Sequence, residues 1–310
     1  MIDLLLAAAF PAKLCPLEAQ TLKQAADRIE AHYVLEERAG AIARELREAA
    51  QDASSASACA DPDAFARDVT KALRETSGDH HFYMERIKDE PQSDWISEWR
   101  ASGASRGQGV GRVEILPGNI GYIQIRSFFE LEPAFRNYRA AFDMVATTHA
   151  LILDLRGNGG GAPETAWPLQ WTFLEKGAPS PMAMQSRNDG VEPREEPSVL
   201  WARYGADRPL AILIDKRTFS APEAVAFTLK TTGRATIIGE PSGGGAHLLD
   251  GGFDLNEGFR LHTPTVRPIS TLNGSNWEAT GVSPDIQVSS EAALDEAVRL
   301  LTTKLKQGGA

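Results

Sequence analysis

One serine in this sequence has a position suited to nucleophilic catalysis. Ser220 lies in the segment Arg217-Thr-Phe-Ser220-Ala-Pro-Glu223, between the apolar run 209–215 and a stretch of helical composition. In a parallel α/β layer this order places the hydroxyl at the carboxyl ends of the strands, beside the positive N-terminus of a helix. A serine at that position can also be an ordinary N-cap. The segment lacks the Gly-x-Ser-x-Gly pattern of α/β-hydrolases.

A glycine-rich loop, residues 157–161, directly follows a second apolar run, 150–155. Taken literally, Gly157-x-Gly159-x-x-Ala162 matches a dinucleotide-binding fingerprint. The acidic residue expected at the end of a second strand about 20 residues later is missing, which argues against nucleotide binding. Two interpretations remain: a plain tight turn, or a loop whose backbone N–H groups stabilise a developing oxyanion.

A nucleophilic serine needs a base, and the chain has six histidines. His80 and His81 follow the end of a predicted helix in Ser77-Gly-Asp-His80-His81, and His247 ends the segment Gly243-Gly-Gly-Ala-His247. Adjacent histidines have poor spacing for a metal ion, and no His-Glu-x-x-His pattern occurs. We therefore expect no metal and no cofactor.

The first hundred residues predict a small helical domain. Apolar residues spaced three to four apart recur in 22–33, 39–46 and 65–73, and Asp61-Pro62 is typical of a helix start. Residues 101–112 have the composition of a linker. The expected organisation is an N-terminal helical domain over 1–100, a linker over 101–112 and a catalytic core over 113–310.

After this linker, apolar strands alternate with helices. The pattern predicts strands at 120–125, 150–155, 209–215 and 235–239, and helices at about 133–145, 163–174 and 221–230. This alternation indicates an α/β fold with mostly parallel pairing and both faces of the sheet covered. The stretch 176–208 is rich in Pro, Glu and Arg, and we expect it to be a long surface insertion.

Composition excludes several classes of protein. The 310 residues carry 42 acidic and 32 basic side chains and a net charge of −10, which argues against a nucleic-acid partner. Two cysteines, Cys15 and Cys59, exclude a disulfide scaffold and a cysteine zinc finger. We favour two unpaired thiols over a single disulfide.

The N-terminus and the hydropathy bear on location. No run of 18 apolar residues occurs, so we expect no transmembrane segment. The short apolar run 4–10 follows Asp3, where a signal peptide would carry Lys or Arg, and no clear cleavage site follows. We interpret residues 1–12 as a packed segment rather than a signal. The sequence leaves the compartment open and favours the cytoplasm over a periplasmic or secreted location.

Several ordered motifs resemble the C-terminal processing (tail-specific) serine protease family. Residues 153–161, Leu-Asp-Leu-Arg-Gly-Asn-Gly-Gly-Gly, resemble its Asp-Leu-Arg-x-Asn-x-Gly-Gly segment, and 218–223 and 233–240 resemble its nucleophile helix and following strand. Residues 243–247 and 276–285 are similar to the subgroup typified by interphotoreceptor retinoid-binding protein and the tricorn protease core. The resemblance covers roughly residues 20–290. It implies a crotonase-like (spiral ββα) core behind a helical domain.

The same resemblance implies peptide hydrolysis through an acyl-enzyme. Carried over by position, Ser220 is the nucleophile. The backbone N–H of Ala221, with that of Gly159 or Gly160, forms the oxyanion hole. The implied partner is a peptide or protein substrate, and a homo-oligomer is possible.

The residues around the general base depart from the pattern of the family. His81 matches the general base of tricorn-type sites, and Glu278 matches the acidic residue that supports it. Gly245 stands where processing proteases carry a lysine base, which excludes a Ser–Lys dyad. His80 replaces the serine that links glutamate to histidine, so the relay could pass through His80, go directly to His81 or be broken. His247 is the alternative base, because in an extended chain it would point where that lysine pointed.

Two other functions stay open. About 30 residues separate His81 from Val113, which leaves no room there for the family's usual PDZ domain. The protein could be a non-catalytic ligand-binding module of the same fold, since fold alone does not fix function. It could also be an acyl hydrolase or cyclase acting on a small natural-product substrate. The joint presence of Ser220, His81 and Glu278 with the glycine loop favours an enzyme.

Overall fold

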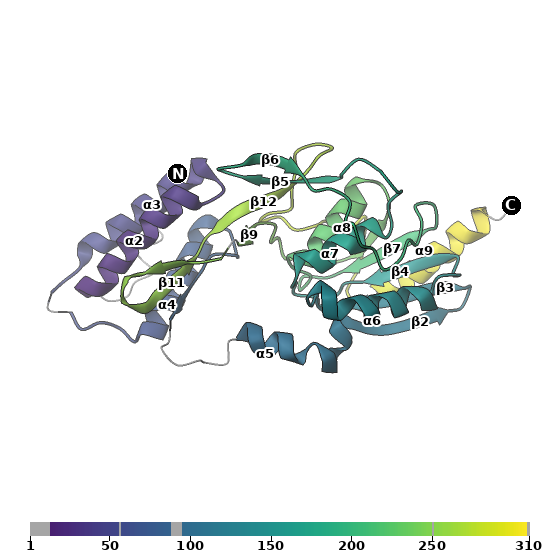
Figure 1. Cartoon of the computed structure of the whole chain (residues 1–310), viewed down its shortest axis with the longest axis horizontal. Helices are drawn as coiled ribbons and strands as arrows, with labels where there is room; N and C mark the ends of the chain where they lie inside the picture. The colour runs from purple at the N-terminus through teal and green to yellow at the C-terminus, as the bar shows by residue number, and fades with distance from the viewer. Residues whose placement is uncertain (1–12, 56, 88–94, 250, 309–310) are drawn as a thin grey trace. The chain divides into compact units, whose positions relative to one another are not determined.

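The computed structural model describes residues 13–55, 57–87, 95–249 and 251–308 and divides the chain into two compact units (Figure 1). The N-terminal unit consists of Met1–Gln92, Met184–Glu192 and His247–Ile269. The α/β unit consists of Ser93–Ala183, Pro193–Ala246 and Ser270–Ala310. Both units are therefore discontinuous in sequence, which no local composition signal indicates.

The expected linker, residues 101–112, contains regular structure. It holds the end of α5 (Trp95–Ser102), the 3₁₀ helix η2 (Ala104–Gly109) and the first residues of strand β2 (Val110–Leu116). All of these belong to the α/β unit. The Gly and Ser residues that suggested a linker lie in a closely packed segment. Gly109 has φ +89°, and a Cβ at this position would collide with the Ser127 carbonyl.

The N-terminal unit contains the predicted helices and two small sheets. Its helices are α2 (Pro16–His32), α3 (Glu36–Ala49), η1 (Ala50–Asp52) and α4 (Pro62–Ser77). Its three-stranded antiparallel sheet has the order β1-β11-β10, from β1 (Tyr83–Arg86), β10 (Phe253–Leu255) and β11 (Phe259–His262), with η3 (Asn256–Gly258) between the last two. The helices confirm the periodicity, whereas the short strands carried no recognisable alternation.

The hydrophobic core of this unit joins helices to strands. Leu22 of α2 and Leu46 of α3 are fully buried, and these two helices lie side by side in Figure 1. The same buried cluster includes Phe259 and Leu261 of β11. The predicted start of α4 is confirmed, because the Asp61 carboxylate accepts the N–H of Ala64 at 2.9 Å.

Cys15 and Cys59 form a disulfide, so the expectation of two unpaired thiols is wrong. The carboxylate of Glu18 holds the segments around the two cysteines together. Glu18 accepts the N–H of Cys15 at 2.8 Å through one oxygen and the N–H of Ala60 at 2.7 Å through the other. A separation of 44 residues gives no sign of this closeness in the sequence.

A four-stranded sheet has the order β6-β5-β12-β9, formed by β5 (Met182–Ser186), β6 (Gly190–Pro193), β9 (Leu248–Leu249) and β12 (Pro264–Ser270). Two of these strands lie in the stretch 176–208, which was expected to be a long surface insertion and for which no strand was predicted. Strand β6 is exposed along its whole length, and β5 is buried only at its start. The alternation that identifies a half-buried strand is therefore absent from the sequence.

The α/β unit is built on a six-stranded sheet of order β13-β8-β7-β4-β3-β2. The remaining strands are β3 (Ile120–Ile125), β4 (Ala150–Asp154), β7 (Leu210–Ile214), β8 (Thr236–Gly239) and β13 (Ile286–Gln287). Pairing is parallel except between β2 and β3. The structure confirms the predicted mixed α/β fold.

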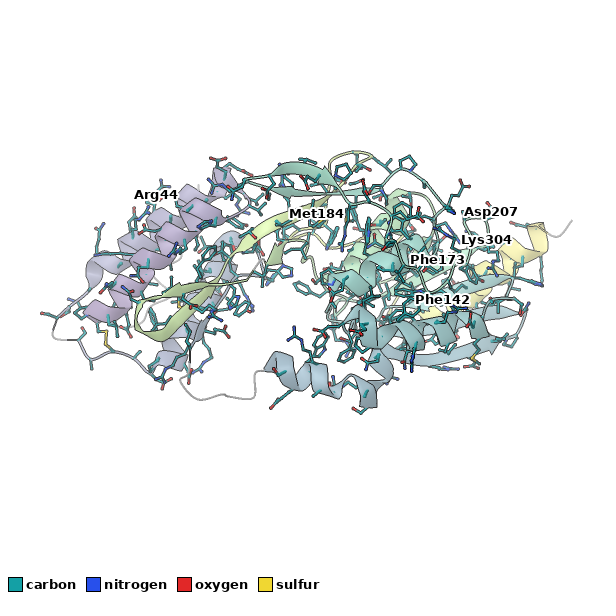
Figure 2. The ribbon with its side chains drawn as sticks, in the orientation of Figure 1. Arg44, Phe142, Phe173, Met184, Asp207 and Lys304 are labelled. Carbon is teal, nitrogen blue, oxygen red and sulfur yellow. A yellow bond between two sulfur atoms is a disulfide. The ribbon has the colours of Figure 1, made fainter. Side chains whose placement is uncertain are left out.

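Helices cover both faces of this sheet: α6 (Leu131–Met144), α7 (Pro163–Trp171), α8 (Ala221–Thr231) and α9 (Ala293–Gly308). In β4, Leu151 and Leu153 join the cluster formed with α6, α7 and α8, while Ile152 joins the cluster formed with α9. This alternation is the period of two expected of a strand. Phe142 and Phe173, labelled in Figure 2, pack edge to face at 5.8 Å in the first cluster.

The expectations about location concern the apolar run 4–10 and membrane-spanning helices. The apolar run 4–10 lies outside the described residues. Within the ranges described above, no helix combines the length and the apolar character needed to cross a bilayer.

Candidate active site

Ser220 occupies a strained turn between β7 and α8. Its backbone has φ +66° and ψ −116°, whereas an N-cap serine has an extended backbone. A residue with a side chain held at such a φ costs on the order of 1–3 kcal/mol and persists where the surrounding structure enforces it, which is common at functional sites. The local geometry therefore departs from the plain N-cap interpretation.

Glu223 enforces this turn. Its Oε2 accepts the N–H of Ser220 at 2.7 Å and that of Gly245 at 2.9 Å, and its Oε1 accepts the Ser242 hydroxyl at 2.5 Å and the N–H of Gly244 at 2.7 Å. The side chain has no solvent exposure. Burial raises the pKa of Glu223 although all four donors favour the carboxylate. Our sequence analysis missed this residue, and the signal available was the Ser-x-x-Glu spacing of a capping box.

The glycine loop is tied to the same turn through Asn158. Its side-chain N–H₂ donates to the Ile125 carbonyl at 3.0 Å, and its side-chain oxygen accepts the N–H of Gly160 at 2.9 Å. Its backbone carbonyl accepts the N–H of Phe219, the residue before Ser220, at 3.0 Å. The loop and the nucleophile turn are thus one hydrogen-bonded assembly.

Gly160 packs directly against Ser220. A Cβ at Gly160, where φ is +113°, would lie 3.2 Å from the Ser220 Cβ and 3.7 Å from its Oγ. Because the Gly160 N–H donates to Asn158, it is occupied. Of the amides predicted for an oxyanion hole, those of Gly159 and Ala221 have no protein acceptor within the described part of the chain. Of the two glycine amides, that of Gly160 is therefore already engaged within the loop.

Glu278 holds backbone in the α/β unit. Its Oε2 accepts the N–H of Ala246 at 2.6 Å, and the indole N–H of Trp277 donates to the Gly245 carbonyl at 2.9 Å. Residues 277 and 278 thereby fix the two residues that precede His247.

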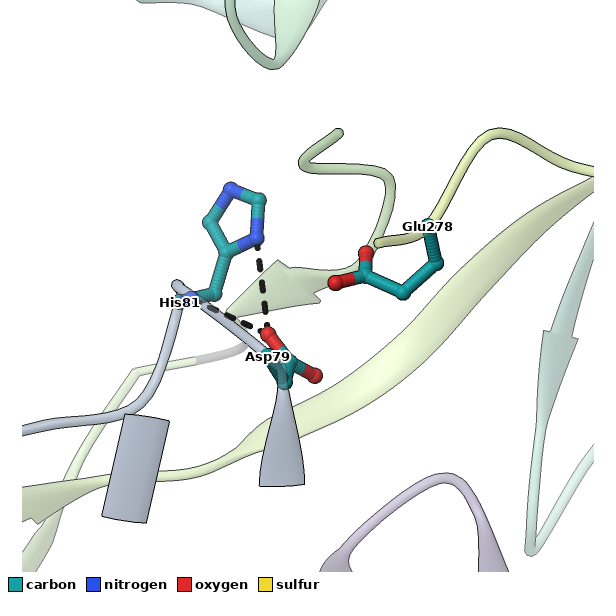
Figure 3. Close-up of side chains that lie close together, drawn as sticks. All are labelled: Asp79, His81 and Glu278. Atoms are coloured by element: carbon teal, nitrogen blue, oxygen red, sulfur yellow. Dashed lines mark hydrogen bonds and ion pairs between the residues drawn. The ribbon is translucent and has the colours of Figure 1, made fainter. Parts of the chain in front are cut away.

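His81 lies in the loop between α4 and β1, beside the buried Asp79 (Figure 3). The His81 backbone N–H donates to Asp79 Oδ1 at 3.0 Å, and its ring Nδ1 lies 3.8 Å from the same oxygen. Burial lowers the pKa of His81 to about 4, although the Asp79 carboxylate opposes this shift. The neighbouring His80 is exposed.

His247 is paired with the other oxygen of Asp79. Its Nδ1 lies 2.5 Å from Asp79 Oδ2, and both side chains are 1% exposed. The Tyr33 hydroxyl donates to Asp79 Oδ2 at 3.2 Å. Burial alone would raise the pKa of Asp79, but the hydrogen bond and charge of His247 bring it below its ordinary value. Asp79 was also missed in the sequence, where it showed only as a residue beside two histidines.

The predicted site residues are thus distributed over both units. Ser220, Ala221, Gly159, Gly160 and Glu278 belong to the α/β unit. The histidines, His80, His81 and His247, belong to the N-terminal unit.

The α/β unit also contains a cavity of about 790 Å³, bordered by residues 173–175, 178–181, 206–210, 232–236, 271–272 and Lys304. This volume is within the range of small-ligand sites. None of the predicted catalytic residues lines it.

Two family models match this chain. The model of peptidase family S41 matches residues 119–288, and the model described as the N-terminal domain of family S41 peptidases in eukaryotic IRBP matches residues 15–106. The first covers more than half of the sequence. The chain therefore belongs to peptidase family S41, whose C-terminal processing members are serine-type peptidases.

Curated relatives agree with this family. The chain is 30% identical over 189 residues to the chloroplastic carboxyl-terminal-processing peptidase 2 of Arabidopsis thaliana, covering 58% of this chain and 35% of that protein. It is 29% identical over 177 residues to the carboxy-terminal processing protease CtpA of Bacillus subtilis, covering 56% and 36%. The chain thus matches about a third of the length of these relatives.

Solved structures share the fold. A lipoprotein from Streptococcus agalactiae has a TM-score of 0.64 at 19% identity, over 95% of this chain and 98% of that chain. The photosystem II D1 C-terminal processing protease has a TM-score of 0.57 at 17% identity, over 92% and 97%. The tricorn protease has a TM-score of 0.55 at 13% identity, over 94% and 37%.

Proposed function

We propose that this protein is a serine peptidase that cleaves peptide bonds through a Ser220 acyl-enzyme. The observation that carries the proposal is the strained Ser220 backbone, held by Glu223 and packed against the glycine loop at Gly160. Membership of family S41 supports the reaction class. The parallel sheet with helices on both faces supports a crotonase-like core for the α/β unit.

In the proposed mechanism an imidazole accepts the Ser220 proton as Oγ bonds to the substrate carbonyl carbon. The amides of Gly159 and Ala221 hold the oxyanion, and each such donor contributes about 2.7–4 kcal/mol to transition-state stabilisation. The imidazolium then gives its proton to the leaving nitrogen as the C–N bond breaks. Water, deprotonated by the same imidazole, adds to the acyl carbon and releases the acid with regeneration of Ser220.

The resemblance assigns the base to His81 and its acidic support to Glu278, with His247 as the alternative and His80 as a relay. The Ala246 contact of Glu278 gives this carboxylate a defined role within its own unit, which is to hold the chain that enters His247.

The substrate class is a peptide or protein, by analogy with the processing proteases named above. The net charge of −10 supports the exclusion of nucleic acid. The Cys15–Cys59 disulfide supports an oxidising compartment in place of the cytoplasm favoured by the sequence, because reducing conditions keep most thiols unpaired.

Labelling with a fluorophosphonate probe, which phosphonylates activated serines with loss of fluoride, tests the proposal. We expect stoichiometric labelling of the wild type, none in Ser220→Ala, and wild-type labelling in the control Ser283→Ala, whose side chain is exposed. Absence of Ser220-dependent labelling in folded protein would refute the enzyme and favour a ligand-binding module.

A substrate screen then separates the remaining alternatives. Cleavage of a peptide library that is lost in Ser220→Ala supports a peptidase. Turnover of small esters or lactams without peptide cleavage would instead indicate an acyl hydrolase or cyclase for a small natural-product substrate.

A further inference from the structure

The α/β unit has a second cavity, of about 690 Å³, whose charged lining is entirely positive. The lining comes from η2, from the first residues of β2 and from the chain just after β3. Among the residues that the structure describes, it holds the arginines Arg106, Arg112 and Arg126 and no acidic side chain. In a chain with a net charge of −10, such a cavity is suited to an anion.

Two of these three arginines have no acidic partner. Arg112 forms an ion pair with Glu114, which offsets part of its charge. Across the described ranges of the chain, neither Arg106 nor Arg126 forms an ion pair, and both are exposed. Two guanidinium groups therefore face the cavity with their charges uncompensated.

A β-bulge sets the position of Arg126. The pairing of β2 with β3 shifts register after Val110, so that residues 111 and 112 stand opposite Gln124 alone. A Cβ at Gly111 would lie 2.9 Å from Arg126 Nε, so the arginine occupies the space that this glycine leaves open. The same Nε donates to Gln124 Oε1 at 2.9 Å. The guanidinium is thus held in place by a neutral acceptor.

The strand directions place this cavity at the same edge of the sheet as the nucleophile. Strands β3, β4 and β7 are parallel, and β2 is antiparallel to β3, so β2 begins where β3 ends. Arg126 follows β3 and Ser220 follows β7, which puts both at the carboxyl ends of the strands. The cavity of about 790 Å³ is lined instead by the starts of β7 and β8, at the opposite edge.

Hydrogen bonds join the cavity to the glycine loop. Ser127 lines the cavity, and its Oγ donates to the Gly160 carbonyl at 3.2 Å. Gly160 in turn packs against Ser220, as described above. A single residue thus lies between the cavity wall and the nucleophile. Because an extended peptide advances about 3.3 Å per residue, a side chain in the cavity belongs to a residue about two to four positions from the bond attacked.

The uncharged part of the lining is compatible with a glutamate side chain. Phe129 is 1% exposed and stacks on Trp99, with 4.5 Å between the ring centroids. The indole N–H of Trp99 donates to Ser127 Oγ at 3.3 Å, which fixes this wall. An apolar surface beside guanidinium groups accepts methylene groups and a carboxylate together, and guanidinium binds carboxylate in a bidentate geometry.

We propose that this cavity is a specificity subsite for an acidic side chain of the peptide substrate. Arg126 and Arg106 bind the carboxylate of a glutamate or aspartate, and Arg112 adds a third positive charge beside them. The proposal rests on the proposed function and names the class of substrate that the same site selects, an acidic peptide.

The test is kcat/KM on matched peptides that carry Glu or Gln at each position from four before to four after the scissile bond. All peptides are amidated at the C-terminus, so that a preference reports the side chain and not a terminal carboxylate. We expect about a tenfold preference for Glu at one position and less than about twofold at the others, because an exposed ion pair contributes modestly and two guanidinium groups act together. Equal rates for Glu and Gln at every position would overturn the proposal.

Variants assign the preference to the cavity. We expect Arg126→Gln and Arg106→Gln each to reduce the Glu/Gln ratio to about threefold, and the double variant to bring it close to one. Arg126→Glu should instead favour Lys over Gln at the same position. The matched control Arg136→Gln removes an exposed arginine of α6 outside the cavity and should keep the tenfold ratio. A ratio that survives in the double variant would contradict the assignment.

Salt gives a test that needs no variant. At 1 M sodium chloride the Debye length falls to about 3 Å, which screens exposed charges. The Glu/Gln ratio of the wild type should therefore fall to about twofold. A ratio that is unchanged at 1 M salt would show that charge does not determine the preference.

Binding to Ser220→Ala separates the two possible failures, because it needs no catalysis. The amidated Glu peptide should bind this variant about tenfold more tightly than the Gln peptide, measured by titration calorimetry. Equal binding, together with Ser220-dependent cleavage by the wild type, would refute only this inference. Absence of Ser220-dependent labelling and cleavage would refute the proposed function itself.

Discussion

Glu223 in the α/β unit and Asp79 in the N-terminal unit are both buried carboxylates with several donors, yet their pKa values move in opposite directions. Glu223 has four donors, three backbone N–H groups and one hydroxyl, and its pKa is raised by burial. Asp79 has an imidazole at 2.5 Å, and its pKa is lowered despite burial.

The difference teaches that donors and charges act differently on a buried acid. Neutral donors satisfy hydrogen bonds but only partly offset the cost of desolvating a charge, whereas a partner that can itself be charged favours ionisation. Glu223 is thus suited to fixing backbone, and Asp79 to fixing a titratable ring. The same residue class performs a structural task in one unit and an electrostatic task in the other.

Removing the backbone-fixing carboxylate should have the largest effect. Glu223→Ala leaves the N–H groups of Ser220, Gly244 and Gly245 and the Ser242 hydroxyl without their acceptor in a site closed to solvent. We expect a loss of about 5 kcal/mol in the free energy of unfolding, measured by denaturant titration. The exposed Glu132→Ala is the control and should change stability by less than about 0.5 kcal/mol.

Opening the disulfide should destabilise the N-terminal unit and leave the α/β unit unchanged. The Cys15–Cys59 bond closes a loop of 44 residues, for which chain entropy predicts about 4 kcal/mol of stabilisation. Reduction, or the pair Cys15→Ala and Cys59→Ala, should increase amide hydrogen exchange in α2, α3 and α4. Equal acceleration of amide hydrogen exchange in the six-stranded sheet would show that the disulfide does not stabilise the N-terminal unit selectively.

The stability of the N-terminal unit, which contains Asp79 and His81, should depend on pH. Because the pKa of His81 in the folded state is about 4, below its ordinary 6.5, the unfolded chain binds this proton first as the pH falls. Stability should therefore drop by about 3 kcal/mol between pH 6.5 and 4. His81→Gln should remove that part of the slope, and an unchanged slope would contradict the lowered pKa.

The smallest effect should come from relieving strain at the nucleophile. Ser220→Gly places the residue that tolerates φ +66° at that position. We expect it to raise the free energy of unfolding by about 1 kcal/mol relative to Ser220→Ala while both variants lose labelling. Equal stability of the two variants would mean that the turn carries little strain.

The central strands and helices of the α/β unit, β3, β4, β7 and β8 with α6, α7 and α8, were predictable because each shows its hydrophobic pattern, whereas α5, α9 and the two-residue β13 were not predicted. Strand β3 was predicted with the same ends as the structure gives, and β4, β7 and β8 within a residue or two. The small sheets were not, because β9 has two residues and β10 three, too few for any period.

The site was predictable where chemistry follows from local order along the chain. Ser220 and Gly159 each follow a strand, and a serine or glycine there has a recognisable purpose. Asp79 and Glu223 were not identified, because a carboxylate gains its meaning from partners far away in sequence. His247 lies 168 residues from Asp79, and no spacing rule connects them.

Because β1 pairs with β11, the N-terminal unit cannot complete its folding until late in translation. Met84 of β1 is nearly buried and pairs with Leu261, so its partner strand leaves the ribosome roughly 180 residues later. At 5–20 residues per second this delay is about 10–35 s, during which the apolar side of the N-terminal helices lacks its covering strand. The nascent N-terminal unit should therefore be a chaperone client until most of the α/β unit has been translated.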